Sequence, residues 1–257
     1  MRILFLGNNQ LAWRILKHLK SRKEKIVGLV LHPKWDTNLP QRKKIIADAQ
    51  VPSKNIFLGH QLKDPAVLKR IKKLKPDIAL LMNFGYIVRP EFLKLFPQGA
   101  INLHPAYLPY NRGQFPNVWS IVDRVQAGVT LHYVDSGIDT GPIAAQVKVR
   151  TESWDTGQTL FVRLQDAAVD LFRKAWPKIK SGRLRGRIQK KRKGSFYKTA
   201  DVQKIDAIDL NKKYRAGDLI NILRARTFPP YDGAYFMDKH RHVYLRLTLH
   251  PKRAKPR

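Results

Sequence analysis

The first twenty residues constrain the fold of this chain more than any other stretch. Residues 2–7, RILFLG, are a short apolar run that ends at Gly7. Apolar residues at helical spacing follow at Leu11, Ile15, Leu16 and Leu19. A strand, a glycine turn and a helix in this order open a doubly wound α/β sheet. The turn lacks the second and third glycines of the dinucleotide-binding fingerprint, so it does not predict that cofactor.

Apolar runs and helix-like segments continue to alternate as far as about residue 180. Strands are predicted over 26–32, 55–58, 100–105, 128–134 and 143–149, with a further strand running into a loop over 77–88. Helices are predicted around 41–50, 67–74, 91–96, 114–121 and 156–179, the last with Thr156 as N-cap. This order predicts one α/β domain over residues 1–182, with a doubly wound, mostly parallel, Rossmann-like sheet.

Three amide side chains, Asn8, Asn9 and Gln10, lie where the chain enters the first helix. Such residues commonly cap a helix, and Asn8 is the preferred candidate for this role. The alternative is that the amides donate hydrogen bonds to a phosphate group of a ligand at the helix N-terminus.

The composition changes after residue 182. A basic run at 189–195 predicts a linker over 183–198, and residues 199–257 then form a small C-terminal α+β subdomain. We expect a helix over 217–225, a strand over 242–249, and fraying beyond residue 250. The tail has more apolar side chains than a frayed extension would carry: Leu219, Ile220, Leu223, Tyr235 and Phe236.

The chain carries 50 Lys and Arg against 19 Asp and Glu, a formal net charge of +31. This charge suits a polyanionic partner such as nucleic acid, and it suits equally well a generally basic, solvated surface. No apolar run approaches the ~20 residues that span a bilayer. The N-terminus reads as a first strand rather than a signal peptide, and the chain has no Cys, so we expect a cytoplasmic protein.

Polar side chains follow a strand in the run INLHPAYLP, residues 101–109. Asn102 and His104 are two apart, so both leave an extended strand on the same face. Pro105 then ends the hydrogen bonding of the strand. An amide can hold an oxyanion and an imidazole can move a proton.

A second polar run, VDSGIDTGP at 134–142, carries Asp135 and Asp139 in a turn-rich segment. A carboxylate can orient an imidazole and stabilise its charge. Asn102, His104 and Asp139 together therefore predict a site for acyl transfer. A single His after a strand, or a single Asp in a turn, would more often be structural.

These motifs resemble the folate-dependent formyltransferases. The resemblance rests on NLHP (102–105), LP (108–109), RG (112–113), GVT (128–130) and DTG (139–141), and it covers residues 1–180 as a fold. The family includes glycinamide ribonucleotide transformylase, methionyl-tRNA formyltransferase and the nucleotide-sugar N-formyltransferases.

The resemblance implies 10-formyltetrahydrofolate as co-substrate and no metal. The family's pterin-binding loop matches Phe84, Gly85, Tyr86 and Ile87, and further folate contacts would come from Asp135, Gly137 and Ile138. Residues 84–87 alone could equally be the end of a buried strand. In the reaction, Asn102 and protonated His104 would hold the oxyanion, and Asp139 would orient His104 and assist proton transfer.

The tail is shorter than the β-barrel domain of methionyl-tRNA formyltransferases. Several runs resemble nucleotide-sugar N-formyltransferases: PYNRG (109–113), QFPNVW (114–119), VTLHY (129–133) and TFPPY (227–231). These enzymes formylate the amine of a nucleotide-linked dideoxy sugar, as in lipopolysaccharide and O-antigen biosynthesis, and related ones are homodimers. A tRNA-directed formyltransferase, favoured by the charge, and a formyltetrahydrofolate hydrolase are the alternatives.

For a nucleotide-sugar, Tyr231 is the candidate to stack on the base. Asn9, Gln10 or Arg112 would meet the pyrophosphate. Arg112 could instead contact the folate tail or form a structural ion pair.

Overall fold

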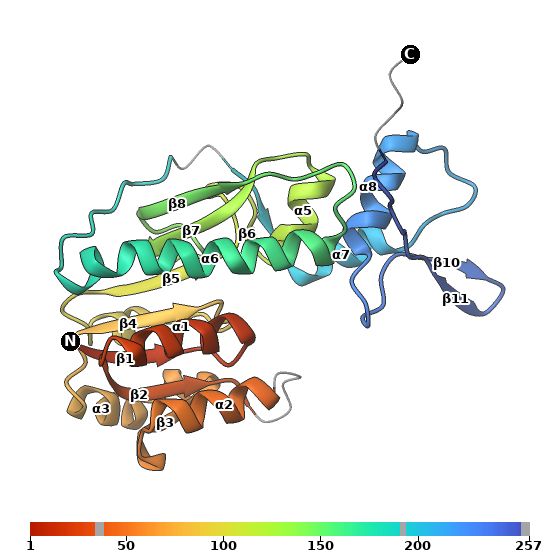
Figure 1. Cartoon of the computed structure of the whole chain (residues 1–257). Helices are drawn as coiled ribbons and strands as arrows, with labels where there is room; N and C mark the ends of the chain where they lie inside the picture. The colour runs from red at the N-terminus through yellow and green to blue at the C-terminus, as the bar shows by residue number, and fades with distance from the viewer. Residues whose placement is uncertain (34–38, 191–193, 253–257) are drawn as a thin grey trace.

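The computed structural model describes residues 1–33, 39–190 and 194–252. Its centre is a seven-stranded sheet with the order β3-β2-β1-β4-β5-β7-β8 (Figure 1). The strands are β1 (Arg2–Leu6), β2 (Lys25–Leu31), β3 (Ile56–Leu58), β4 (Ile78–Met82), β5 (Ala100–His104), β7 (Ala127–Tyr133) and β8 (Ile143–Val149). The first five are parallel, β7 is antiparallel to β5, and β8 is antiparallel to β7. The predicted doubly wound, mostly parallel sheet is confirmed.

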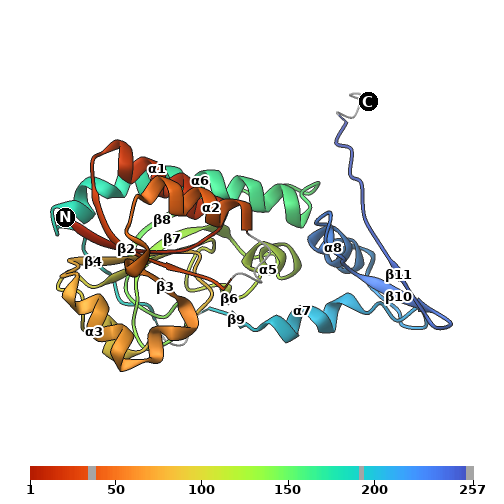
Figure 2. The same cartoon turned by 90° about the horizontal axis from the view of Figure 1, so that it is seen from below.

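Helices cover both faces of the sheet. Figure 2 shows α1 (Gln10–Ser21), α2 (Leu39–Ala49) and α6 (Gly157–Lys180) on one side, and α3 (Pro65–Lys73) on the other. Alternate side chains of each strand enter opposite cores: Phe5 packs with the α1 layer, and Leu4 packs with the α3 layer. Burial on both faces explains why these strands read as continuous apolar runs.

Short elements complete this domain. They are the 3-10 helices Ser53–Asn55 and Gly59–Lys63, α4 (Pro90–Leu93), β6 (Arg112–Gly113) and α5 (Pro116–Val122). The helix predicted over 91–96 is thus only a single turn, because Lys94 to Gly99 turn into β5. Part of the loop before α2, residues 34–38, lies outside the described residues.

The cap of α1 is Asn9, so the prediction that Asn8 caps this helix is wrong. Oδ1 of Asn9 accepts a hydrogen bond from the backbone N–H of Ala12 at 2.9 Å. Asn8 instead lies buried at the exit of β1. Thr156 caps α6 as predicted, accepting from the backbone N–H of Thr159 at 3.2 Å.

The segment after α6 packs back onto the sheet domain. Its strand β9 (Phe196–Tyr197) pairs in parallel with β6. The Tyr197 ring stacks on Trp119 of α5 with centroids 3.8 Å apart. Residues 183–198, predicted as a linker, thus contact the first domain at Leu184, Arg187, Gln189 and β9, while most other described residues of the segment are exposed. Residues 191–193 lie outside the described residues.

The C-terminal region lies beyond α5 at one end of the molecule (Figures 1 and 2). It contains α7 (Thr199–Asp206), α8 (Ala216–Arg226), β10 (Tyr235–Asp238) and β11 (Arg241–Tyr244), the two strands forming an antiparallel hairpin. The strand predicted to run to residue 249 ends at Tyr244, where β10 no longer faces it. Val202 and Ala225 are buried in the same core as the sheet. Residues 253–257 of the expected frayed end lie outside the described residues.

The contact between α6 and α8 leaves no room for a side chain at Gly157. A Cβ there would lie 2.1 Å from the carbonyl oxygen of Ala225. We expect Gly157→Ala to lower the free energy of unfolding by roughly 2–3 kcal/mol, the usual size of an overpacking defect. The control is Gly217→Ala in α8, where a Cβ would meet only the Arg124 guanidinium, at 3.6 Å. Equilibrium denaturation measures both, and equal stability of the two variants would contradict the close packing.

Candidate active site

The polar strand exits meet in a cavity of about 960 Å³. Asn8 and Asn9 after β1, Asn83 after β4, and His104 at the end of β5 all line it. The carboxyl ends of parallel strands are where doubly wound sheets bind their ligands.

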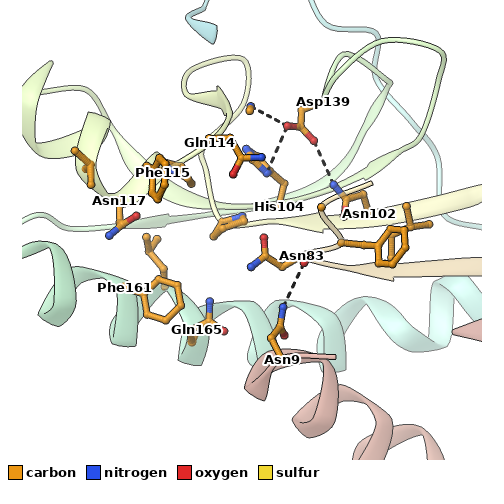
Figure 3. A pocket seen from close by; sticks show the side chains of 18 of the residues that line it. Asn9, Asn83, Asn102, His104, Gln114, Phe115, Asn117, Asp139, Phe161 and Gln165 are labelled. Carbon is orange, nitrogen blue, oxygen red and sulfur yellow. Dashed lines mark hydrogen bonds and ion pairs between the residues drawn. The ribbon is translucent and has the colours of Figure 1, made fainter. Parts of the chain in front are cut away.

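The carboxylate of Asp139 is the centre of the site (Figure 3). Oδ2 accepts a hydrogen bond from the backbone N–H of Gly113 at 2.9 Å and lies 3.6 Å from Nδ1 of His104. Oδ1 accepts from Nδ2 of Asn102 at 3.2 Å and lies 3.3 Å from Nε2 of His132. The structure thus brings together Asn102, His104 and Asp139, and it adds His132.

Strand pairing places these groups. Asn102 and His104 leave β5 on one face, as their spacing predicts. The antiparallel register of β5 and β7 sets His132 opposite Asn102. Asp139 reaches the same point from the β7–β8 loop, with its backbone in the left-handed region at a φ of 54°.

Carbonyl contacts fix the proton positions on both imidazoles. Nε2 of His104 lies 3.1 Å from the carbonyl oxygen of Asn111, and Nδ1 of His132 lies 2.8 Å from that of Tyr133. A carbonyl only accepts, so each of these nitrogens carries the hydrogen. The other nitrogen of each ring, Nδ1 of His104 and Nε2 of His132, is left facing Asp139.

Burial lowers the pKa of His104, although the nearby charge of Asp139 and the Asn111 carbonyl act in the opposite direction. The expectation of a protonated His104 stays a prediction, because burial and the Asp139 charge act on this group in opposite directions. For Asp139, burial alone would raise the pKa. The interactions with His104 and His132 and the hydrogen bond from Gly113 outweigh it and hold this pKa well below its usual range. Asp139 is therefore an ionised carboxylate.

Most other predicted site residues line the same cavity: Asn9, Gln10, Phe84, Gly85, Tyr86, Ile87, Asp135, Gly137, Ile138 and Tyr231. Residues 84–87 follow β4 as a loop rather than ending a buried strand, and Ile87 is 70% exposed. Asp135 orders the other loop, because its Oδ1 accepts from the backbone N–H of Gly137 at 3.0 Å and from the Thr140 hydroxyl at 2.7 Å.

Arg112 does not line the cavity. Its Nη2 donates to Oε1 of Gln189 at 2.8 Å. This contact is a hydrogen bond to a neutral amide rather than the ion pair that the sequence left open, and a side chain outside the described cavity wall gives the expected phosphate contact no support. Two other cations, Arg14 and Arg226, line the cavity, and each is paired with an aspartate, Asp166 and Asp206 respectively.

The sequence reasoning missed several residues of the cavity wall: Gln114, Phe115, Asn117, His132, Phe161, Gln165 and Phe228. Asn8, which the sequence offered as an alternative ligand donor, also lines the cavity. Figure 3 shows Phe161 and Gln165, both on α6, across the cavity from Asp139. Their spacing of four places them on one helical face, a signal that was available but indistinguishable from core packing.

Asn8 Nδ2 and Gln165 Nε2 are buried and have no hydrogen-bond partner in the described part of the chain. Both are donors available to a ligand.

A family model described as formyl transferase matches residues 1–175. The chain belongs to the formyltransferase family. A second model, described as the N-formyltransferase dimerization C-terminal domain, matches residues 201–251. The resemblance drawn from the NLHP and DTG motifs is confirmed, and this chain is a formyltransferase.

This formyltransferase is similar to three described proteins. It is 35% identical over 188 residues to dTDP-4-amino-4,6-dideoxyglucose formyltransferase of Mycobacterium tuberculosis, covering 73% of this chain and 80% of that one. It is 26% identical to a 4-N formyltransferase from Francisella tularensis, with a TM-score of 0.84 over 98% of both chains. It is 32% identical to the formyltransferase PseJ from Anoxybacillus kamchatkensis, with a TM-score of 0.58 over 79% of this chain and 89% of that one.

The described residues contain neither a metal-binding cluster nor a membrane-spanning helix. Within residues 1–33, 39–190 and 194–252, no group of three or more His, Asp or Glu side chains is arranged to hold a metal ion. None of the helices in this part of the chain is long and apolar enough to cross a membrane.

We expect the change Asp139→Asn to reduce turnover by at least ~100-fold, because an amide cannot stabilise a charged imidazole. His104→Ala and Asn102→Ala should each cost at least as much, from the usual size of acid–base and oxyanion contributions. Asp170→Asn, an exposed aspartate on α6, is the matched control. Steady-state kinetics with the formyl donor measure the effect, and near-normal turnover of His104→Ala would refute the assignment.

The lowered pKa of His104 predicts a pH-dependent stability. The unfolded chain binds a proton here near the ordinary pKa of 6.5, whereas the folded protein binds it only at lower pH. The free energy of unfolding should therefore fall as the pH drops below about 6.5. In His104→Gln this fall should be smaller. Burial also lowers the pKa of His18, but His18 is present in both proteins, so its contribution to the pH dependence cancels in the comparison. Urea unfolding between about pH 7 and pH 5 tests this, and parallel curves would contradict it.

Proposed function

We propose that the protein transfers the formyl group of 10-formyltetrahydrofolate to the amine of a nucleotide-linked amino-dideoxy sugar. The observation that carries this proposal is a row of three aromatic rings in the wall of the cavity. The ring centroid of Phe161, on α6, lies 5.3 Å from that of Phe228, and the centroid of Phe228 lies 5.8 Å from that of Tyr231. Phe228 and Tyr231 belong to the C-terminal region. Tyr231 is 58% exposed. An aromatic row joined by one cavity to the Asp139 centre suits a base at one end and a reacting amine at the other.

The names of two relatives support this substrate class. The M. tuberculosis enzyme is a formyltransferase for a dTDP-linked 4-amino sugar. The A. kamchatkensis structure is described in complex with UDP-4,6-dideoxy-4-formamido-L-AltNAc and tetrahydrofolate. The two nucleotides differ, so the relatives support the class of nucleotide-sugar and leave the base open.

The described wall of the cavity is rich in amides and poor in unpaired cations. Arg14 and Arg226 both have carboxylate partners, and no lysine of the described residues lines this cavity. The orphan donors of Asn8 and Gln165 therefore suit the sugar and pyrophosphate oxygens. The net charge of +31 lies mainly on other surfaces.

His104 is suited to accept the proton of the attacking amine. In the neutral ring Nδ1 carries the lone pair and lies 3.6 Å from Asp139, so an imidazolium formed there pairs at once with a carboxylate. In the reaction a carbon–nitrogen bond forms between the sugar amine and the formyl carbon. The bond from that carbon to the folate nitrogen breaks, and His104 passes the proton to this nitrogen.

Asn102 is suited to stabilise the oxyanion that forms between these two steps. One N–H of its amide holds Asp139, and the other faces Nε2 of His132 at 3.3 Å. The N–H that faces His132 is the one available to a developing negative charge. The loop of residues 84–87 and the turn of Asp135, Gly137 and Ile138 would hold the folate beside it.

The C-terminal region supports a homodimer. We assign residues 1–182 to catalysis, 183–198 to the connecting segment and 199–257 to a subdomain that pairs two copies. Partly exposed apolar side chains remain on α8 and on the β10–β11 hairpin: Leu219, Ile220, Leu223, Phe236, Met237 and Tyr244. An association surface of this kind explains their exposure.

A formylation screen tests the proposed substrate class. Purified enzyme with 10-formyltetrahydrofolate should turn over an amino-sugar nucleotide and leave initiator methionyl-tRNA unformylated. The Michaelis constant for the sugar nucleotide should rise only a few-fold between about 50 and 200 mM salt, because a pyrophosphate makes few ionic contacts. An RNA substrate would lose orders of magnitude in affinity over that range. Turnover of tRNA with no amino sugar formylated would contradict the proposal.

A further inference from the structure

Gln189 lies in the segment between the two family-matched regions, 1–175 and 201–251. Its side chain is buried, with the residue 6% exposed, whereas its neighbour Ile188 is 81% exposed. A buried amide is costly unless its hydrogen bonds are satisfied. In this basic, otherwise exposed segment, one buried amide calls for a specific set of partners.

All four hydrogen bonds of the Gln189 amide are made. Nε2 donates to the carbonyl oxygens of Asp139, at 2.8 Å, and Gly141, at 2.7 Å. Oε1 accepts from Nη2 of Arg112 at 2.8 Å and from Nε at 3.3 Å. The guanidinium can only donate, so Arg112 fixes which end of the amide faces the Asp139 loop.

The Asp139 backbone needs such a partner. Its φ of 54° is uncommon for a residue with a side chain and is kept only where the surroundings hold it. Gln189 binds the carbonyl of this same residue. A change in the Asp139 backbone would swing the carboxylate away from His104 and Asn102.

The same segment also supports His104. The hydroxyl of Ser195 accepts from the backbone N–H of Asn111 at 2.9 Å and donates to its Oδ1 at 3.0 Å. The Asn111 carbonyl is the partner of Nε2 of His104. Gln189 therefore supports Asp139, and Ser195 supports the carbonyl partner of His104.

We propose that Gln189 is a positioning residue of this formyltransferase. It lies outside the described wall of the cavity, and it acts by fixing the carboxylate of Asp139 at His104. The kinetic consequence rests on the proposed function, but the geometry does not. A displacement of about 1 Å in a reacting group can cost ~100-fold in rate.

Three variants of the full chain separate positioning from packing. Gln189→Met keeps the shape and loses every hydrogen bond. Gln189→Glu keeps the acceptor for Arg112 and loses both donors to the loop. Ile188→Gln changes the exposed neighbour. We expect Met and Glu at position 189 to lower kcat at least ~10-fold per folded enzyme, with the Michaelis constants changed less than threefold, and Ile188→Gln to match wild type.

A second measurement does not depend on which substrate accepts the formyl group. The groups that face the His104 ring are Asp139, His132 and the Asn111 carbonyl. If the Asp139 carboxylate moves away, the pKa of His104 should fall. NMR titration of the His104 ring in the free enzyme measures this pKa. We expect this pKa to fall in Gln189→Met and to stay unchanged in Ile188→Gln.

The proposal is overturned if Gln189→Met keeps kcat within twofold of wild type. It is also overturned if activity falls only in step with the folded fraction while the His104 titration stays unmoved. If wild-type enzyme formylates no amino sugar, the proposed function fails, but the titration still decides the role of Gln189.

Discussion

The buried negative charge of Asp139 is the constraint on which the site depends. An ionised carboxylate in a protein interior is tolerated only with several polar partners. Here they are a backbone N–H of Gly113, the amide of Asn102 and the rings of His104 and His132. These partners come from β5, β6 and β7, so strand pairing far from the reacting atoms decides whether the charge is stable. A carboxylate held in this way is fixed before a substrate arrives, which is how a preorganised site lowers a barrier.

The two histidines play different parts because their carbonyl partners differ in position. His132 is anchored through Nδ1 by Tyr133, its neighbour along β7. His104 is anchored through Nε2 by Asn111, whose own conformation depends on Ser195, far along the chain. His104 therefore links the reaction centre to the segment after α6 through Asn111, as Gln189 does through the carbonyl of Asp139. This dependence explains why a basic stretch that reads as a solvated linker is packed against the loops of the site.

The charge of the chain and the chemistry of its site are separate properties. In the described wall of the cavity, both arginines are paired with aspartates. This wall also presents amides and aromatic rings to a ligand. A site of this composition selects by hydrogen-bond geometry and stacking, both of which are little affected by salt. The excess of Lys and Arg acts at long range, on solubility and on encounters with anions.

The sequence alone determined the sheet, its helices and the family, because apolar periodicity and short motifs such as NLHP are local properties of the chain. It also placed Asn102 and His104 on one face, since alternation along a strand is local. It could not find His132 or Gln189, or exclude Arg112 from the cavity. His132 enters through the register of β5 and β7, and Gln189 through a return of the chain across fifty residues. The direction of the shift in the pKa of His104 also depends on the tertiary structure, because burial lowers this pKa and only the packed fold determines what is buried.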